Sequence, residues 1–371
     1  MEEIIAPIDK NLIKAELTSA KKLRNTNKGS NEIYVVNHHN SPNIMLEIGR
    51  IREVAFRDSG GGCGLSIDID EFDTMENPYQ QLIVWDPDAE AILGGYRYIF
   101  GSDATFTEDG QPYLATSHQF RFSDKFIKEY LPHTLELGRS FVAPEYQSSK
   151  AGAKSLFALD NLWDGICAVM MEKPEMKYFF GKMTIYPTYN REARDLILNF
   201  LESHYGDPDK LVRPYEPIEL TTDQEYLDSI IDKSLTFKES YKLLNTEVRK
   251  HGVNIPPLVN AYMGLSPTLK MFGGCVNHEL NMIEDYGILI SFDDMYEENK
   301  ARHLDSYLNE KMGIIKNKFP QFFEDMGDNL RVMILQRRER IQARKAEKLQ
   351  KRMAKQKSVN NPPPRVTEDL L

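Results

Sequence analysis

One segment, residues 135–142 with the sequence LELGRSFV, constrains the fold more than any other. It is apolar and strand-like, yet it carries a carboxylate at Glu136 and a guanidinium at Arg139. Side chains on a regular strand alternate between its two faces, so these charges point apart unless a bulge intervenes. With a bulge, the two charges would share a cleft. The other interpretation is a structural ion pair at the edge of a sheet.

Length and composition are those of a globular protein. The chain has 371 residues and is 41% hydrophobic, which is enough for a full core and about two domains. Its start is acidic and then lysine-containing, unlike a secretory signal, and no stretch approaches the ~20 apolar residues that span a bilayer. Cys63, Cys167 and Cys275 are too far apart for a zinc cluster of close pairs or a disulfide framework, and they fit a cytoplasmic location.

Charge is distributed unevenly along the chain. The net charge is -10, but residues 337–357 contain ten Lys/Arg and two Asp/Glu, so this segment is +8 and the remainder is -18. An acidic body argues against nucleic-acid binding across the fold. The basic segment is expected to be a solvated helix, or a peripheral contact with anionic membranes at the inner face of the cytoplasmic membrane.

The order of predicted elements indicates an α/β fold. Apolar patterning predicts strands at 32–36, 81–86, 92–100, 135–142, 178–186, 272–280 and 286–292, and helices at 44–56, 154–171, 190–205 and 255–262. A turn at 86–88 makes a hairpin of two strands, so the sheet should be mixed. We expect a lead-in at 1–32, a main domain at 33–292 with a helical insertion at 206–250, and a helical basic extension at 293–371 with a disordered end.

Two groups of charged residues together suggest a binding pocket for an amino acid. Residues 68–73 contain four carboxylates, which repel one another unless they are solvated or receive a cation such as an ammonium group. Arg52, Arg97 and Arg139 each have apolar neighbours, and guanidinium groups suit carboxylates. The glycine cluster at 60–64 follows a helix and precedes a strand, the reverse of the dinucleotide-binding order, and is expected to be a mobile loop.

Four motifs occur in order: Ile51-Arg52-Glu53-Val54-Ala55-Phe56, Asp70-Glu71-Phe72-Asp73, Leu93-Gly94-Gly95-Tyr96-Arg97 and Glu136-Leu137-Gly138-Arg139-Ser140-Phe141-Val142. Together they resemble two related bacterial families, the acyl-homoserine-lactone synthases and the hemolysin-like N-acyltransferases that make ornithine and glycine lipids. Later matches, at 180–182, 255–262 and 273–275, extend the resemblance over residues 33–292 and favour the lipid enzymes.

This resemblance implies a GNAT-like mixed β-sheet flanked by helices and a fatty acyl donor on acyl carrier protein. The 3-hydroxy fatty acyl group would pass from its phosphopantetheine thioester to the α-amine of glycine or ornithine, with no bound cofactor or metal. The alternatives are a homoserine-lactone-type autoinducer synthase and a non-catalytic lipid-binding protein on the same fold.

The donor loop departs from the usual GNAT pattern. Ordinary members bind pyrophosphate at a helix N-terminus through a Gln/Arg-x-x-Gly-x-Gly/Ala motif. Here Lys150 replaces the first glycine, which weakens a cradle for two phosphates but suits the single phosphate of a carrier protein. Coenzyme A is then the less favoured donor. The predicted donor-binding residues are Gln147, Lys150, Gly152, Ala153 and Lys154.

The implied mechanism is direct attack of the amine on the thioester, and the resemblance assigns the roles. Glu136 would accept a proton from the amine, and backbone N–H groups of Phe141 and Val142 would hold the oxyanion. The predicted acceptor-binding residues are Asp70 and Asp73 for the ammonium group, Arg97 and Arg139 for the carboxylate, and Arg52 in the pocket wall.

Overall fold

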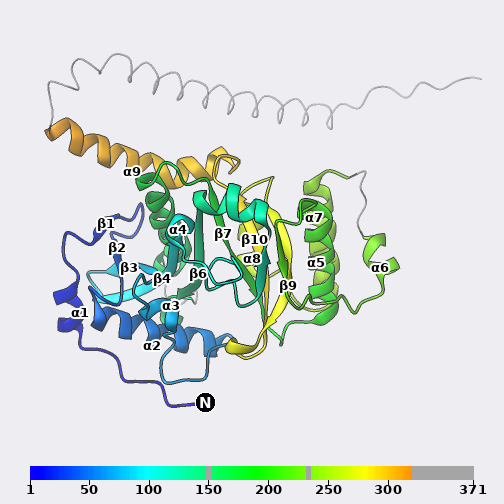
Figure 1. The fold of residues 1–371 in the computed structure, drawn as a ribbon, viewed down its shortest axis with the longest axis horizontal. Helices are drawn as coiled ribbons and strands as arrows, with labels where there is room; N and C mark the ends of the chain where they lie inside the picture. Colours follow the sequence, from blue (N-terminus) through cyan, green and yellow to red (C-terminus); the bar gives the residue numbers. More distant parts are fainter. Residues whose placement is uncertain (148–152, 231–234, 319–371) are drawn as a thin grey trace, which may run out of the picture. The chain divides into compact units, whose positions relative to one another are not determined.

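The computed structural model describes residues 1–147, 153–230 and 235–318. Its centre is an eight-stranded sheet in the order β1-β2-β3-β4-β6-β7-β10-β9 (Figure 1). The bounds are β1 (Lys22–Asn25), β2 (Glu32–Val36), β3 (Gln80–Asp86), β4 (Ala91–Phe100), β6 (Thr134–Val142), β7 (Tyr178–Ile185), β9 (Lys270–Asn277) and β10 (Ile283–Ser291). Only β6 and β7 pair in parallel among these strands of the described chain, so the predicted mixed sheet is confirmed.

Two helices cover opposite faces of the sheet. The helix α2 (Pro42–Asp58) begins with a proline in its first turn and buries an apolar stripe that includes Ile44 and Ile48 against Ile83 of β3. The helix α4 (Ala153–Glu172) covers the other face, where Leu82 lies 2.7 Å from the position that a Cβ atom on Gly165 would occupy. Leu82 and Ile83 are neighbours on one strand, so their side chains point to opposite faces.

The remaining elements surround this core. The helix α5 (Arg191–Tyr205) packs against α7 (Phe237–Lys250) and β9. A second, two-stranded sheet joins β5 (Phe120–Phe122) to β8 (Val212–Pro214). The other helices are α1 (Lys10–Glu16), α3 (Glu71–Thr74), α6 (Gln224–Ser229), α8 (Pro257–Met263) and α9 (Glu297–Lys318). No helix in the described part of the chain is long and apolar enough to cross a membrane.

The boundaries of the compact unit differ from the predicted domains. One unit runs from Met1 to Tyr307, so it includes the lead-in at 1–32, which supplies α1 and β1. It also includes the start of α9, because Nδ1 of His303 lies 2.7 Å from Oδ1 of Asp164 of α4 in a buried hydrogen bond. The second unit, Leu308–Leu371, is described only at 308–318, which are helical. The basic segment at 337–357 lies outside the described residues.

Candidate active site

The predicted bulge is present in β6. Gly95 of β4 pairs with Phe141, and Arg97 pairs with Gly138, so one residue of β4 faces both Arg139 and Ser140. The backbone of Arg139 adopts a left-handed conformation, with φ at +46°, which is uncommon outside glycine and typical of such a bulge. Arg139 and Glu136 consequently line the same small cavity. The structure therefore confirms that the two charges share a cleft.

A large cavity opens where β6 and β7 separate. The two strands pair only over 134–136 and 178–180. Beyond this short ladder they line a cavity of about 1030 Å³. Its walls are mainly apolar, and its lining includes Tyr96, Leu137, Val142, Trp163, Phe179, Tyr186, Ile255, Leu258, Tyr262 and Ile288. An apolar cavity of this size suits a long acyl chain together with the arm that carries it.

The hydrogen-bond pattern of β6 indicates which of its backbone N–H groups face away from β4, toward this cavity. The N–H of Ala143 donates to the carbonyl oxygen of Leu93 on β4 at 2.9 Å. Backbone groups alternate along an antiparallel ladder, so the N–H of Val142 points away from β4 and that of Phe141 points toward it. Val142 therefore keeps the geometry of an oxyanion donor, whereas the sequence-based assignment of Phe141 is not supported.

A second, smaller cavity lies on the α2 side of the same strand. It measures about 130 Å³, and its lining includes Asp70, Tyr79, Arg97, Thr116, His118, Glu136, Arg139, Lys182, Asn277 and Glu279. Leu137, Gly138, Arg139 and Lys182 line both cavities. The bulge of β6 thus forms part of the wall of both cavities.

Glu136 is almost completely buried in this wall, with 1% of its surface exposed. Oε1 accepts hydrogen bonds from the backbone N–H and the hydroxyl of Thr116, at 3.1 and 2.6 Å, and Oε2 accepts one from the Tyr79 hydroxyl. A carboxylate offers about four lone-pair positions. Three are filled by these donors, so Oε2 retains one position for a proton or an incoming amine.

Burial raises the pKa of Glu136 above its ordinary value of 4.5, although the Thr116 and Tyr79 hydrogen bonds and the positive charge of Arg97 act in the other direction. Within the described residues no cation forms an ion pair with Glu136. A carboxylate with a raised pKa accepts protons more readily at neutral pH than an ordinary glutamate does. The environment therefore suits a general base.

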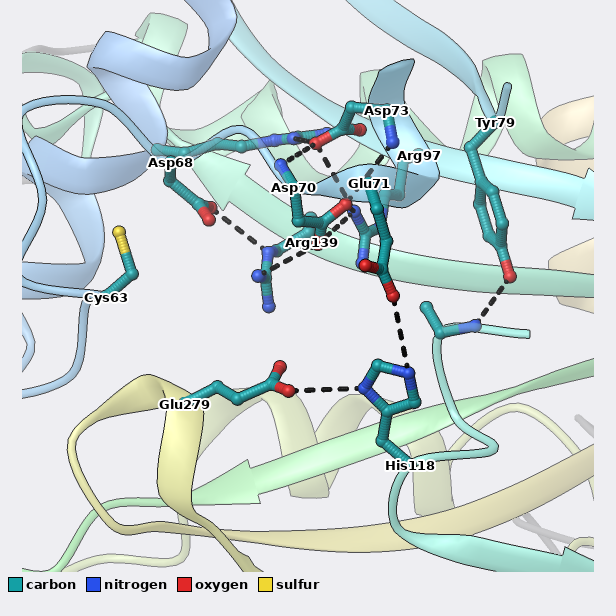
Figure 2. Close-up of polar contacts among 12 residues, drawn as sticks. Cys63, Asp68, Asp70, Glu71, Asp73, Tyr79, Arg97, His118, Arg139 and Glu279 are labelled. Carbon is teal, nitrogen blue, oxygen red and sulfur yellow. Dashed lines mark hydrogen bonds and ion pairs between the residues drawn. The ribbon is translucent and has the colours of Figure 1, made fainter. Parts of the chain in front are cut away.

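The predicted acceptor-binding arginines and aspartates pair with one another (Figure 2). Nη1 of Arg97 donates to both oxygens of Asp70, at 2.6 and 2.7 Å, and lies 3.3 Å from Asp73. Arg52 is fully buried behind them and donates to Asp73 at 3.0 Å. Neither Arg52 nor Asp73 is among the described residues that line the two cavities.

Arg139 completes the cluster from the bulge. Its Nε lies 3.1 Å from Asp68, and its Nη2 lies 3.2 Å from Asp70. Three arginines thus balance three aspartates, and the carboxylates that were expected to await an ammonium group already have cations within the chain. The expectations that Asp73 binds the ammonium group and that Arg52 lies in the pocket wall are therefore wrong. Asp70, Arg97 and Arg139 still line the small cavity, but as members of ion pairs.

The glycine loop at 60–64 wraps around a glutamate rather than a phosphate. The backbone N–H groups of Cys63 and Gly64 donate to Glu53 at 3.0 and 2.8 Å, and Arg57 donates to it at 2.6 Å. Burial opposes ionisation of Glu53, but these donors outweigh it and lower its pKa. The interpretation as a loop rather than a phosphate cradle agrees with this arrangement.

Only part of the predicted donor loop is described. Gln147 lines the large cavity and donates to the carbonyl oxygen of Val142 at 2.7 Å. Lys150 and Gly152 lie outside the described residues, and Ala153 and Lys154 form the start of α4.

Comparison with known proteins identifies the family. Residues 51–156 match the model of the Acetyltransferase (GNAT) domain. A glycine N(alpha)-acyltransferase of Bacteroides thetaiotaomicron is 59% identical over 85% of this chain and 94% of its own length, and one of Phocaeicola vulgatus is 58% identical over 84% and 95%. The chain belongs to the GNAT-fold N-acyltransferase family that contains these enzymes. This N-acyltransferase also resembles a solved CoA-dependent acyl-homoserine lactone synthase with SAM and isopentyl-CoA, at 12% identity, a TM-score of 0.27, and coverage of 45% of this chain and 72% of that one. That likeness is too low to bear on the fold or the function.

Sequence analysis missed three residues of the site in this N-acyltransferase. Tyr79 and Thr116 hold Glu136, and Lys182 lines both cavities. Tyr79 and Thr116 are uncharged residues of common types that belong to no recognised motif, so nothing in the sequence marks them. Lys182 lies in the Phe180-Gly181-Lys182 motif, where a cation in a strand-like run was the available signal.

Proposed function

We propose that this N-acyltransferase transfers a fatty acyl group from an acyl carrier protein thioester to the α-amine of glycine. The observation that carries the proposal is the meeting of two cavities at the β6 bulge, beside the buried carboxylate of Glu136. One cavity has the size and apolar lining for an acyl thioester, and the other is small and polar.

The size of the small cavity supports glycine as the acceptor. A volume of about 130 Å³ corresponds to the share of about four water molecules in the liquid, at ~30 Å³ each. Glycine fits such a space, whereas ornithine adds a three-carbon amine that needs further room and an acidic partner. The aspartates at 68–73 are already paired with arginines, and Glu279, a further acid of the lining, contacts His118. The relatives named glycine N(alpha)-acyltransferases are in keeping with this acceptor.

The reaction then needs one proton acceptor and one oxyanion donor. The lone pair of the neutral amine attacks the thioester carbonyl, and Glu136 takes one proton from the nitrogen, directly or through water, as the C–N bond forms. The N–H of Val142 holds the resulting oxyanion. When the tetrahedral intermediate collapses, the C–N bond remains and the C–S bond breaks. The thiolate leaves, and the proton held by Glu136 returns to it as a thiol.

A carrier protein as the donor rests on the sequence of the donor loop, where Lys150 replaces a glycine of the usual pyrophosphate cradle. A carrier presents one phosphate on its pantetheine arm, so a weakened cradle is sufficient. Coenzyme A presents two further phosphate groups that would need the missing contacts.

The test is a donor-by-acceptor matrix with the purified full-length chain. Palmitoyl or 3-hydroxypalmitoyl thioesters of acyl carrier protein and of coenzyme A are each incubated with glycine or ornithine, and products are identified by mass spectrometry. The proposal predicts N-acylglycine, formed faster from the carrier thioester. Acylation of ornithine alone would contradict the acceptor, faster turnover of the coenzyme A thioester would contradict the donor, and a lactone product would contradict both.

A further inference from the structure

We propose that Lys182 binds the carboxylate of the acceptor amino acid and thereby selects α-amino acids over simple amines. This inference rests on the proposed function and extends it to a residue outside the charged segments at 68–73 and 135–142. It follows from the position of Lys182, from its partners, and from the pairing of the arginines that would otherwise take this role.

Lys182 lies in the middle of β7, where it reaches both cavities. Its side chain is 18% exposed. Among the described residues, Lys182 is the one lysine that lines the small cavity. Glu136 pairs with Phe180 across β6 and β7, and Lys182 is two residues further along β7. Side chains two residues apart share a face, so Lys182 and Glu136 lie on the same side of the sheet.

The partners of Lys182 occupy some, but not all, of the N–H donors of its ammonium group. Nζ lies 2.9 Å from Oδ2 of Asp285 and donates to the amide oxygen of Gln119. An ammonium group has three N–H donors. Among the described residues the third donor has no partner, and it is available to a group in the cavity.

Asp285 is a fixed anchor for the lysine. It is 1% exposed and accepts hydrogen bonds from Thr184 at 2.7 Å and Asn277 at 2.8 Å. Burial opposes its ionisation, but Lys182, Thr184 and Asn277 outweigh this effect and lower the pKa of Asp285. The negative charge of Asp285 is therefore shared among several donors, which keeps Lys182 extended at the cavity wall.

The arginines of the cavity are poorly placed for the same task. Arg97 is 3% exposed and directs Nη1 at both oxygens of Asp70. Arg139 divides its donors between Asp68 and Asp70. A substrate carboxylate at either arginine would lie beside the charge of Asp70, and like charges at such distances repel. At Lys182 the neighbouring acid is Asp285, whose charge is shared with the donors Thr184 and Asn277.

Lys182 and Glu136 together orient the acceptor amino acid in the small cavity. A carboxylate at Lys182 and an amine at Glu136 suit a molecule in which one carbon atom separates the two groups. A simple amine has no group for Lys182 to bind, so its nitrogen is not held at Glu136. The cavity thus distinguishes an α-amino acid from an amine by its charge as well as by its size.

The experiment compares glycine with glycinamide, which has the same amine but no carboxylate, as acceptors for the full-length enzyme and its Lys182→Met variant. The wild type is expected to prefer glycine by at least ~10-fold in kcat/KM, the size of one charged hydrogen bond. Lys182→Met should raise the KM for glycine at least ~10-fold, leave the rate with glycinamide within ~3-fold, and so abolish the preference. The KM for the acyl donor should not change.

Two further variants control for folding and general charge. Lys182→Arg keeps the cation and should retain most of the preference. Lys270 of β9 forms a similar pair, with Nζ 3.2 Å from Asp207, and lines neither cavity in the described residues. Lys270→Met should therefore leave the preference unchanged. Thermal unfolding of each variant verifies the fold.

Equal loss of activity toward glycine and glycinamide in Lys182→Met, or a preference that survives the substitution, would overturn the assignment. The proposed acceptor is judged separately. If the wild type acylates ornithine rather than glycine, glycine is wrong as the acceptor, and the same comparison with ornithine and its amide still decides the role of Lys182.

Discussion

Two groups of buried charges lie on the same side of β6, and they differ in how their charge is balanced. The Arg–Asp cluster joins Arg52, Arg97 and Arg139 to Asp68, Asp70 and Asp73 within hydrogen-bonding distance. Glu136, in the same wall, is contacted within the described residues by the neutral donors Tyr79 and Thr116. The positive and negative charges of the cluster balance one another, whereas the charge of Glu136 is not balanced by an ion pair within the described residues.

This difference separates structure from chemistry. In a carboxylate paired with cations, the lone pairs accept hydrogen bonds from those cations and the group stays ionised. Such carboxylates hold the loop after α2 and the bulge of β6 in place. A buried carboxylate without a cation has a raised pKa and a free lone pair, so it can take a proton. The sequence places both kinds of acid next to arginines, and only the contacts distinguish them.

The largest expected effect comes from removing one charge of the Arg–Asp cluster, and it is on the free energy of unfolding. Asp73→Asn removes the negative charge from Arg52 and Arg97, and leaving a buried cation unpaired costs about 3 kcal/mol or more in the free energy of unfolding. Chemical denaturation at pH 7 measures the change. Lys22→Met breaks the half-exposed pair with Glu32 and should cost about 1 kcal/mol or less. A cost for Asp73→Asn no larger than that for Lys22→Met would show that the cluster is not structural.

The same variant should also alter the acid limb of stability. Burial would raise the pKa of Asp73, but Arg52, Arg97 and Arg139 hold it well below its ordinary value of 3.8. A depressed pKa contributes stability above the ordinary value that is lost as the pH falls below it. Asp73→Asn should therefore lose less stability than the wild type between pH 5 and pH 2. An unchanged acid limb would contradict the pairing.

Glu136→Gln should leave the fold intact and reduce turnover. Without a proton acceptor, acyl transfer to glycine is expected to fall on the order of 10²-fold or more. The matched control, Glu32→Gln, changes a glutamate on β2 that is remote from both cavities and should stay within ~2-fold of the wild type. Near wild-type transfer by Glu136→Gln would remove it from the role of base.

Tyr79→Phe should have a smaller effect that appears in the pH dependence. The Tyr79 hydrogen bond favours ionised Glu136, so its loss raises the pKa of Glu136 further. Because the base must be deprotonated, the rising limb of kcat/KM should move to higher pH, while the plateau rate changes little. The acceptor amine is the same in both enzymes, so a limb at an unchanged pH would indicate that another group titrates.

Much of the sheet was predictable, because its strands are long apolar runs. The strands β2, β3, β4, β6 and β7 follow the expected ranges within two residues. The sequence of β1, KLRN, is short and polar, so periodicity does not detect it, and β5 and β8 contain only three residues each. These strands form because a neighbouring strand is available.

The site was predictable in its charges and not in its contacts. Opposite charges in an apolar strand indicated the bulge at Arg139, which is a local property. The pairing of Arg139 with Asp68 joins residues far apart in the chain, and it reverses the expected role of the acidic run. Propensity and spacing do not encode such pairings, which depend on how the loop before α3 meets β6.

The most direct test of this account is a titration of both groups in one sample, labelled with ¹³C at the side-chain carboxyls of aspartate and glutamate. Resonances of Glu136 and Asp73 are assigned by their absence in Glu136→Gln and Asp73→Asn. The account predicts that Glu136 titrates above 4.5, while Asp73 stays ionised to well below 3.8. A Glu136 resonance that titrates at or below 4.5 would contradict the claim that an uncompensated carboxylate serves as the base.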